Sequence, residues 1–371
     1  MKLVVVHPAH MDYRAELFKR LNQNYDTTFL FTKQGRGQDN VNEKQQKIPE
    51  EWNSKVLKSD FEIGQRDIGM YLRLVRELLY GKYDVILTST SWYICWTIAK
   101  IRRKKFVFMT EFWYWEDTSF TRQYLNKFTR HISKNSNSIF AMGTNAYNYY
   151  TNIGVDKDKV FMHPQCAVDY SKQSVFDLRS KLKLNNKQVI LYLGRIIERK
   201  GLRWLLEVFK KIDEENENAF LLIAGDGPDK SVCEKIASDL KINNILFTGQ
   251  IEENEKASYY NVCDVFVMPS IFLEHSYEPW GLVINEAMAF SKPIIATNAV
   301  GASADMIINS YNGYIVEEKN KDELYEFMKK ILSNPEKMKT MGENSRKVFE
   351  KKNDYSAFAE TLIKSIEYAC D

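Results

Sequence analysis

The sequence predicts an α/β protein of two domains, each a parallel sheet covered by helices. Three observations support this prediction. The chain has 371 residues, more than one hydrophobic core usually supports. Short apolar runs of strand length alternate with amphipathic runs of helical spacing. The alternation starts at Leu3 and starts again near Lys187, so we expect two successive sheets rather than one.

The first half of the chain alternates strands and helices as a βαβ protein does. The expected strands are Leu3–Val6, Thr28–Phe31, Asp84–Thr88 and Lys105–Met109. The expected helices are Arg14–Leu21, Tyr71–Leu79 and Trp92–Lys100. Because helices separate consecutive strands, the strands pair in parallel and the helices cover both faces of the sheet. We place this Rossmann-like domain at residues 1–168.

The second half repeats the pattern. Its expected strands are Gln188–Leu193, Ala219–Ala224, Ile245–Phe247, Asp264–Met268 and Lys292–Ala296. We place this second Rossmann-like domain at residues 169–350 and expect residues 351–371 to form a helix that packs back on the first domain. Domains of this kind bind ligands at the carboxyl ends of their strands. We therefore expect the domains to face each other across a ligand-binding cleft.

Composition narrows the class of protein. A hydrophobic content of 44% with 27% charged residues is typical of a soluble globular protein. The net charge of +3 gives no reason to expect nucleic acid as a partner. The five cysteines form no Cys-x-x-Cys pair, so we expect neither zinc nor a disulfide framework. The start reads as a strand rather than a signal peptide, and no apolar run approaches the ~18 residues of a membrane span. We expect a cytoplasmic protein.

The segment Glu278-Pro-Trp-Gly-Leu-Val-Ile-Asn-Glu286 places two carboxylates eight positions apart at the start of a predicted helix. It follows a predicted strand, so its Pro-Trp-Gly turn suits a strand-to-helix junction, where backbone N–H groups favour an anion. Either the two glutamates only complement the helix dipole in solvent, or they bind a ligand that carries phosphate and hydroxyls. A sugar nucleotide is such a ligand.

A basic loop follows an earlier strand of the same domain. Its sequence is Gly194-Arg-Ile-Ile-Glu-Arg-Lys-Gly201, in which Arg195 and Lys200 can reach one diphosphate unless they are merely solvated. Gly225-Asp-Gly-Pro228 follows the next strand. Lys230 occupies the third glycine position of a dinucleotide fingerprint, which disfavours a nicotinamide-dependent oxidoreductase.

Taken together, these segments resemble the retaining family-4 glycosyltransferases of GT-B fold, the glycosyl transferases group 1. The matching runs between Val189 and Leu324 are LYLGRIIERKG, LLIAGDGP, FTGQI, CDVFVMPS, EPWGLVINEAMA, KPIIAT and NGYIV. The N-terminal half matches through its βαβ pattern and through NYYTNIGVDKDKVFMHPQCAVD.

The resemblance implies a retaining, metal-independent hexosyltransferase without a bound cofactor. It would move a sugar from a UDP- or GDP-sugar donor to a glycan or lipid-linked saccharide, in cell-surface polysaccharide or glycoconjugate biosynthesis. The resemblance assigns Arg195 and Lys200 to the donor diphosphate, Glu278 to the sugar hydroxyls and Glu286 to the ribose. The other donor-binding residues that it implies are Gly194, Gly225, Gly281, Leu282 and Val283.

Two residues of the N-terminal half are candidate catalytic groups on the acceptor side. Glu111 follows the strand after which family members often carry a histidine, and either it takes that place near the reacting sugar or it caps a helix. His10 lies after the first strand, together with His7. Either these histidines bind the acceptor, or they satisfy backbone groups of the loop.

Basic and aromatic residues interleave in the first half of the chain. The basic residues are Arg66, Arg73, Arg76, Lys82 and Arg102–Lys105, and the aromatic ones are Tyr71, Tyr80, Trp92 and Trp96. Either they hold the protein peripherally at an anionic membrane surface, or they form a solvated face over core aromatics. Two alternative functions stay open, namely a UDP-sugar 2-epimerase of GT-B fold and a non-catalytic nucleotide-sugar-binding protein.

Overall fold

The computed structural model describes residues 1–32, 47–57, 62–63, 66–114, 119–273 and 276–371. The chain folds as two compact units. The N-terminal unit is Met1–Pro164 together with Tyr355–Asp371, and the C-terminal unit is Gln165–Asp354. The domain limits expected from the sequence, 168/169 and 350/351, lie a few residues from these divisions.

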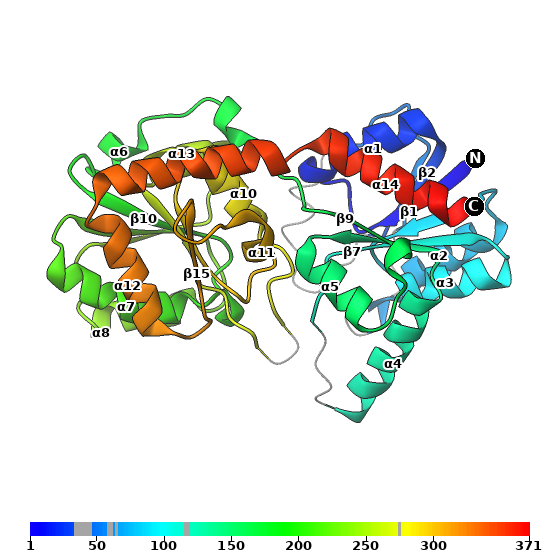
Figure 1. The fold of residues 1–371 in the computed structure, drawn as a ribbon, viewed down its shortest axis with the longest axis horizontal. Helices are drawn as coiled ribbons and strands as arrows, with labels where there is room; N and C mark the ends of the chain where they lie inside the picture. Colours follow the sequence, from blue (N-terminus) through cyan, green and yellow to red (C-terminus); the bar gives the residue numbers. More distant parts are fainter. Residues whose placement is uncertain (33–46, 58–61, 64–65, 115–118, 274–275) are drawn as a thin grey trace. The chain divides into compact units, whose positions relative to one another are not determined.

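The N-terminal unit is built on a parallel sheet with the strand order β3-β2-β1-β6-β7-β8-β9 (Figure 1). The strands are β1 (Lys2–His7), β2 (Asp26–Phe31), β3 (Ser54–Val56), β6 (Val85–Thr88), β7 (Lys105–Thr110), β8 (Ser138–Met142) and β9 (Val160–His163). A separate antiparallel pair joins β4 (Glu62–Ile63) to β5 (Arg66–Asp67). The sequence predicted β1, β2, β6 and β7, whereas β3, β8 and β9 were not predicted.

Helices cover both faces of this sheet. The helices α2 (Ile68–Tyr80), α3 (Trp92–Ile101), α4 (Phe120–Lys134) and α5 (Thr144–Asn152) share one hydrophobic core with the sheet. On the other face, α14 (Tyr355–Cys370) packs against the strands and against α1 (Asp12–Asn24) (Figure 1). The ring of Phe358 meets Phe140 of β8 edge-on at 5.1 Å, which ties the end of the chain to this unit.

The C-terminal unit contains a second parallel sheet with the strand order β12-β11-β10-β13-β14-β15. The strands are β10 (Gln188–Leu193), β11 (Ala219–Ala224), β12 (Ile245–Gly249), β13 (Val265–Met268), β14 (Ile294–Thr297) and β15 (Gly313–Val316). From β10 the following strands β11 and β12 are added toward one edge of the sheet, whereas from β13 the strands β14 and β15 are added toward the other edge. A topological switch point therefore lies between β10 and β13. Parallel sheets bind ligands at the carboxyl ends of the strands that flank such a point.

Alternate side chains of the central strands enter two different cores. Ile190 and Tyr192 of β10 pack with α7 (Leu202–Glu215), α8 (Lys230–Asp239) and α12 (Lys321–Leu332). Their neighbours on β10 pack with α9 (Lys256–Val262), α10 (Leu282–Ala289) and α13 (Pro335–Lys352). Burial on both faces explains why these strands are continuous apolar runs in the sequence. Within the described residues, we find no helix that combines the length and apolarity needed to cross a bilayer.

Candidate functional site

Two loops meet at the switch point of the C-terminal sheet. Residues 194–201 follow β10, and a second loop follows β13. Gly201 makes their contact possible, because a Cβ atom at this position would lie 1.8 Å from the carbonyl oxygen of Pro269. Gly201 also has a φ of +71°, in the left-handed region that favours glycine. The last glycine of the basic loop therefore sets how closely the loop approaches its neighbour.

Glu278 lies at this junction and binds two cations of the basic loop. Lys200 Nζ is 2.5 Å from Glu278 Oε2. Arg199 Nη1 donates to the same carboxylate oxygen and, at 3.2 Å, to the carbonyl oxygen of Tyr277. The structure thus brings the predicted residues Glu278 and Lys200 together and adds Arg199, which our sequence analysis did not name. The run Glu198-Arg-Lys200 signalled a second cation but not the direction in which it points.

Burial and charge act against each other in this cluster. Only 9% of Glu278 is exposed, and burial by itself disfavours its charged form. Lys200 and Arg199 outweigh that effect and hold the pKa of Glu278 below its usual value. Burial, with some help from the Arg199 charge, lowers the pKa of Lys200 despite the attraction of Glu278. We conclude that the site holds an ionised carboxylate between two cations.

Backbone contacts hold Glu278 in place from the other side. The N–H of Gly301, in the loop after β14, donates to the Glu278 carbonyl oxygen at 3.0 Å. The N–H of Ala302 donates to the Trp280 carbonyl oxygen at 2.9 Å. These bonds attach the loop of a third strand to the site. Rigid main-chain support of this kind favours a fixed side-chain position over an adaptable one.

The start of α10 lies directly after Glu278. Gly281 is the N-cap residue and adopts φ 99° and ψ 63°, a left-handed conformation. Leu282 and Val283 form the first turn, where backbone N–H groups have no carbonyl partner inside the helix. The three residues that the sequence named for a phosphate therefore stand at a helix N-terminus, where anions are stabilised.

Glu286 lies one turn further along α10 and is held by two residues of α9. The Tyr260 hydroxyl donates to Glu286 Oε2 at 2.6 Å, and Lys256 Nζ is 3.5 Å from Oε1. Burial and the Glu286 charge raise the pKa of Tyr260 well above its usual value, so its hydroxyl stays protonated and able to donate. The two contacts fix the orientation of the Glu286 carboxylate.

The remaining predicted residues of this unit lie at the ends of β10 and β11. Arg195 is exposed on the basic loop. Gly225 donates its N–H to Gly249 at 2.8 Å and lies against Gly194, whose carbonyl oxygen would be 1.9 Å from a Cβ at position 225. Gly225 therefore permits the close approach of two loops. Among the residues described, no group of three His, Cys, Asp or Glu side chains is arranged to hold a metal ion.

The N-terminal unit has a pocket of about 330 Å³ at the carboxyl end of its own sheet. Glu111, directly after β7, lines this pocket together with His7, Arg14 and Thr90. His10 is not among the lining residues. It is 1% exposed and packs in an aromatic cluster, with its ring 5.4 Å from that of Trp52. Of the two predicted acceptor-side residues, the structure places only Glu111 at the pocket.

His7 reaches the pocket that His10 does not. Its Nδ1 lies 2.8 Å from the Ala9 carbonyl oxygen, which can only accept, so Nδ1 carries the proton and Nε2 has a free lone pair. Burial, together with the nearby charge of Arg14, lowers the pKa of His7 to about 3. A neutral imidazole with a lone pair can accept a hydrogen bond from a ligand hydroxyl.

Doubly wound domains commonly bind nucleotides at a switch point of this kind. Residues 175–348 match the model of the family described as glycosyl transferases group 1. The matched segment lies within the C-terminal unit, Gln165–Asp354.

Relatives with assigned names match mainly this half. An uncharacterized glycosyltransferase of Methanocaldococcus jannaschii is 35% identical over 181 residues, 49% of this chain and 48% of the relative. The capsular polysaccharide biosynthesis glycosyltransferase CapM of Staphylococcus aureus is 33% identical over 171 residues, 46% of this chain and 43% of the relative. The chain thus spans about half the length of these curated relatives.

Solved structures match the whole chain in fold. HepE of Anabaena, in complex with UDP and glucose, has a TM-score of 0.77 at 15% identity and covers 99% of both chains. The sucrose-phosphate synthase of Thermosynechococcus elongatus has a TM-score of 0.75 at 19% identity, covering 99% of this chain and 98% of that one. At these identities the likeness concerns the fold alone. The chain has the GT-B fold, which confirms the fold class predicted from the sequence.

Proposed function

We propose that this protein is a glycosyltransferase that moves a sugar from a nucleotide-sugar donor to a glycan or lipid-linked saccharide. The observation that carries the proposal is the contact of Glu278 with both Arg199 and Lys200 beside the start of α10. Such a site offers positive charge and backbone N–H groups to a diphosphate, and a carboxylate to sugar hydroxyls. Polysaccharide synthesis is the setting named for the relative CapM.

The proposed chemistry uses the chain's own charges. When the nucleoside diphosphate leaves, negative charge builds on its phosphates, and Lys200 with the first turn of α10 stabilises that charge. Arg195, exposed on the same loop, adds a further cation. We include independence of metal ions in the proposal because these groups supply the charge that a metal ion would otherwise supply. Retention of the anomeric configuration is also part of it, as in the family that the motifs resemble.

The acceptor would enter the pocket of the N-terminal unit. Its volume of about 330 Å³ is comparable to that of a small saccharide portion. His7 Nε2 and Glu111 present hydrogen-bond acceptors there, which suits a ligand made of hydroxyls. We keep Glu111 as the proposed acceptor-activating group and assign His10 no contact with the ligand, since it packs among aromatic rings.

We place the reaction in the cytoplasm, with the enzyme held peripherally at the inner face of a membrane. A lipid-linked acceptor would require that location. UDP- and GDP-sugars are the donors we consider first, since UDP and glucose occupy the HepE structure and a GDP-mannose-dependent mannosyltransferase of Mycobacterium tuberculosis is 27% identical over 209 residues.

A donor screen followed by product analysis tests the proposal. We expect one sugar nucleotide to raise Tm, because a ligand at 100 times its Kd stabilises the folded state by about 2.7 kcal/mol. That donor, mixed with saccharide acceptors in the presence of EDTA, should yield a product that retains the donor's anomeric configuration. An epimerised nucleotide sugar formed without acceptor would instead identify an epimerase. Donor binding without any product would identify a binding protein.

Glu286 should act in nucleotide binding rather than in turnover. We expect Tyr260→Phe to weaken nucleotide affinity by about tenfold, the loss of a hydrogen bond to a charged group, and Glu286→Gln to weaken it at least as much. The fall in kcat at saturating donor should stay within about twofold, because these residues do not touch the reacting atoms. Titration calorimetry with the free nucleotide and steady-state kinetics measure the two effects.

Tyr259→Phe is the matched control, since it removes a hydroxyl from the neighbouring position of α9 without touching Glu286. It should leave nucleotide affinity unchanged. A Tyr260→Phe protein that binds the nucleotide as tightly as the wild type would remove Glu286 from the proposed ribose site.

A further inference from the structure

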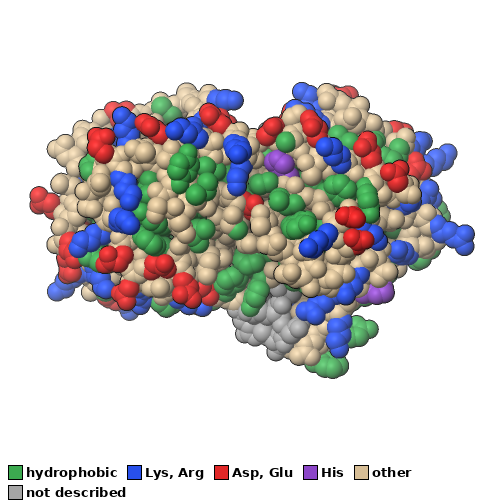
Figure 2. All heavy atoms as spheres, in the orientation of Figure 1, with side chains coloured by type: hydrophobic (Ala, Val, Ile, Leu, Met, Phe, Trp, Pro, Cys, Tyr) green, Lys and Arg blue, Asp and Glu red, His purple; other side chains and the backbone are tan. Residues whose placement is uncertain are grey.

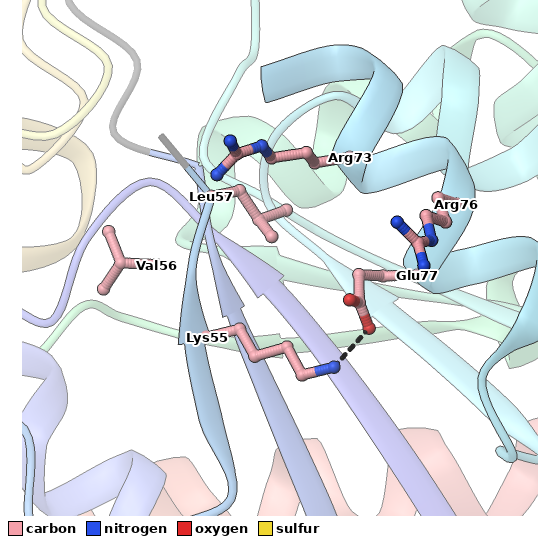
Figure 3. A pocket seen from close by; sticks show the side chains of 6 residues that line it. All are labelled: Lys55, Val56, Leu57, Arg73, Arg76 and Glu77. Atoms are coloured by element: carbon pink, nitrogen blue, oxygen red, sulfur yellow. Dashed lines mark hydrogen bonds and ion pairs between the residues drawn. The ribbon is translucent and has the colours of Figure 1, made fainter. Parts of the chain in front are cut away.

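The layer formed by α2, α3 and α4 carries a strong excess of positive charge. The three helices contain seven Lys or Arg residues and one acidic residue, Glu77, whereas the whole chain has a net charge of only +3. Glu77 is bonded to Lys55 of β3 at 2.7 Å, as Figure 3 shows. Arg73 and Arg76 of α2 flank that ion pair in the same pocket (Figure 3). The acidic group is thus already compensated within this unit.

Three of the four aromatic residues expected on this surface, Tyr71, Trp92 and Trp96, are partly buried and pack against the core. Trp92 stacks on Phe108 of β7 at 4.9 Å, and Trp96 packs edge-on against Phe128. Arg102 donates to the carbonyl oxygens of Leu78 and Gly81, so its charge is used inside the unit. Tyr80, by contrast, is 81% exposed. Trp92, Trp96 and Arg102 are therefore engaged within the unit, and of these expected surface residues Tyr80 is the one that is largely exposed.

Helix α4 supplies most of that surface. Its residues Phe120 and Tyr124 are 86% and 69% exposed. Residues that alternate in spacing between four and three positions lie on one side of a helix. On α4 these residues are Phe120, Tyr124, Lys127, His131 and Lys134. The opposite side packs on the unit through small and polar residues and Ile132. Figure 2 shows hydrophobic and basic side chains gathered over α4 in this view.

We propose that the outer side of α4 docks on the headgroups of an anionic lipid bilayer. Lys127 and Lys134 would contact the headgroups, while Phe120 and Tyr124 enter the boundary with the acyl chains. The exposed aliphatic residues Leu72 of α2 and Ile101 of α3 lie in the same helix layer and extend the apolar contact. Aliphatic side chains gain from acyl chains but not from stacking on bases, which favours lipid over nucleic acid.

The inference builds on the proposed function by naming the surface that brings the enzyme to a lipid-linked acceptor. Its test needs neither donor nor acceptor, so the two proposals can fail separately. Vesicle binding without transfer would leave the docking surface standing. Transfer to a soluble saccharide without vesicle binding would leave the transferase standing.

Co-sedimentation of the full chain with vesicles tests the proposal. We expect binding to phosphatidylcholine vesicles that contain phosphatidylglycerol and none to phosphatidylcholine alone. Raising the salt from about 0.1 M to 1 M shortens the Debye length from about 10 to 3 Å and should release the protein. The variant Lys127→Glu with Lys134→Glu should bind at least 20-fold more weakly, since each cation near an anionic surface contributes about fivefold. Phe120→Ser with Tyr124→Ser should weaken binding about tenfold at constant charge.

The control variant is Lys339→Glu with Lys351→Glu, which makes the same change of charge on exposed positions of α13 in the C-terminal unit. It should bind within about twofold of the wild type, because a local surface rather than net charge is responsible. All variants should keep the wild-type Tm. The proposal is overturned if the control weakens binding as much as the α4 variants do, or if the wild type binds no anionic vesicle. Retention by RNA but not by vesicles would assign the surface to nucleic acid and also overturn it.

Discussion

Glu278→Gln is expected to lower kcat/KM for sugar transfer by about 10- to 100-fold, because a hydrogen bond from the donor sugar to a charged group contributes about 1.5–3 kcal/mol. The substitution keeps the shape of the side chain but leaves Arg199 and Lys200 without the carboxylate that both contact. It also removes the acceptor that we propose for the sugar hydroxyls. Initial rates over a range of donor concentrations measure the effect.

Affinity for the free nucleotide should fall much less in this variant, since Glu278 is assigned to the sugar and not to the base or ribose. Glu198→Gln serves as the matched control, because Glu198 lies next to Arg199 in the sequence but its side chain is exposed. It should behave as the wild type does. A Glu278→Gln protein with full transfer activity refutes the site, and an equal loss of nucleotide affinity would make the residue structural.

Lys200→Met is expected to reduce kcat by about 100- to 1000-fold, the effect of removing one preorganised donor that stabilises charge in a transition state. Arg199→Met should raise KM for the donor and lower kcat less, because Arg199 acts through Glu278. Lys200 would then act mainly on kcat, whereas Arg199 would act mainly on the KM for the donor. Steady-state kinetics with both variants separates these roles, and equal loss of kcat in both would contradict our assignment.

The pH profile gives an independent readout of Lys200. Burial lowers its pKa, so transfer should fall, as the pH rises, at a lower pH than an ordinary lysine would set. Lys200→Arg keeps the positive charge and should move that alkaline limb upward, because an arginine does not deprotonate in this range. An unchanged limb in Lys200→Arg would assign the titration to another group.

Local sequence pattern was sufficient for the framework of both units. Alternating apolar runs predicted β1, β2, β6 and β7 and the central strands of the second sheet, because strands buried on both faces must be apolar throughout. The strands β8 and β9 were not predicted, although they complete the N-terminal sheet. Both are brief apolar runs, and periodicity alone does not distinguish such a run from helix or loop.

The site required contacts between distant segments. Arg199 and Glu278 are 79 positions apart, and nothing in the spacing of Glu198-Arg-Lys200 shows which cation turns toward the carboxylate. Gly201, at the end of that loop, packs closely against Pro269 of the loop after β13. In the same way, the fold turns His7 toward the pocket and His10 toward Trp52, although His7 ends β1 and His10 lies only three positions further on.

The sequence by itself determined the α/β class, the resemblance of the C-terminal unit to the glycosyl transferases group 1 and the position of Glu278 and Lys200 in loops after strands. These features depend on local periodicity and on motifs whose glycines and charges have fixed spacing. Only the tertiary structure decided that Arg199 joins the carboxylate, that Tyr260 and Lys256 hold Glu286, and that Trp92 lies against the core. Side-chain direction depends on how separate elements pack, and packing follows from contacts between residues far apart in the chain.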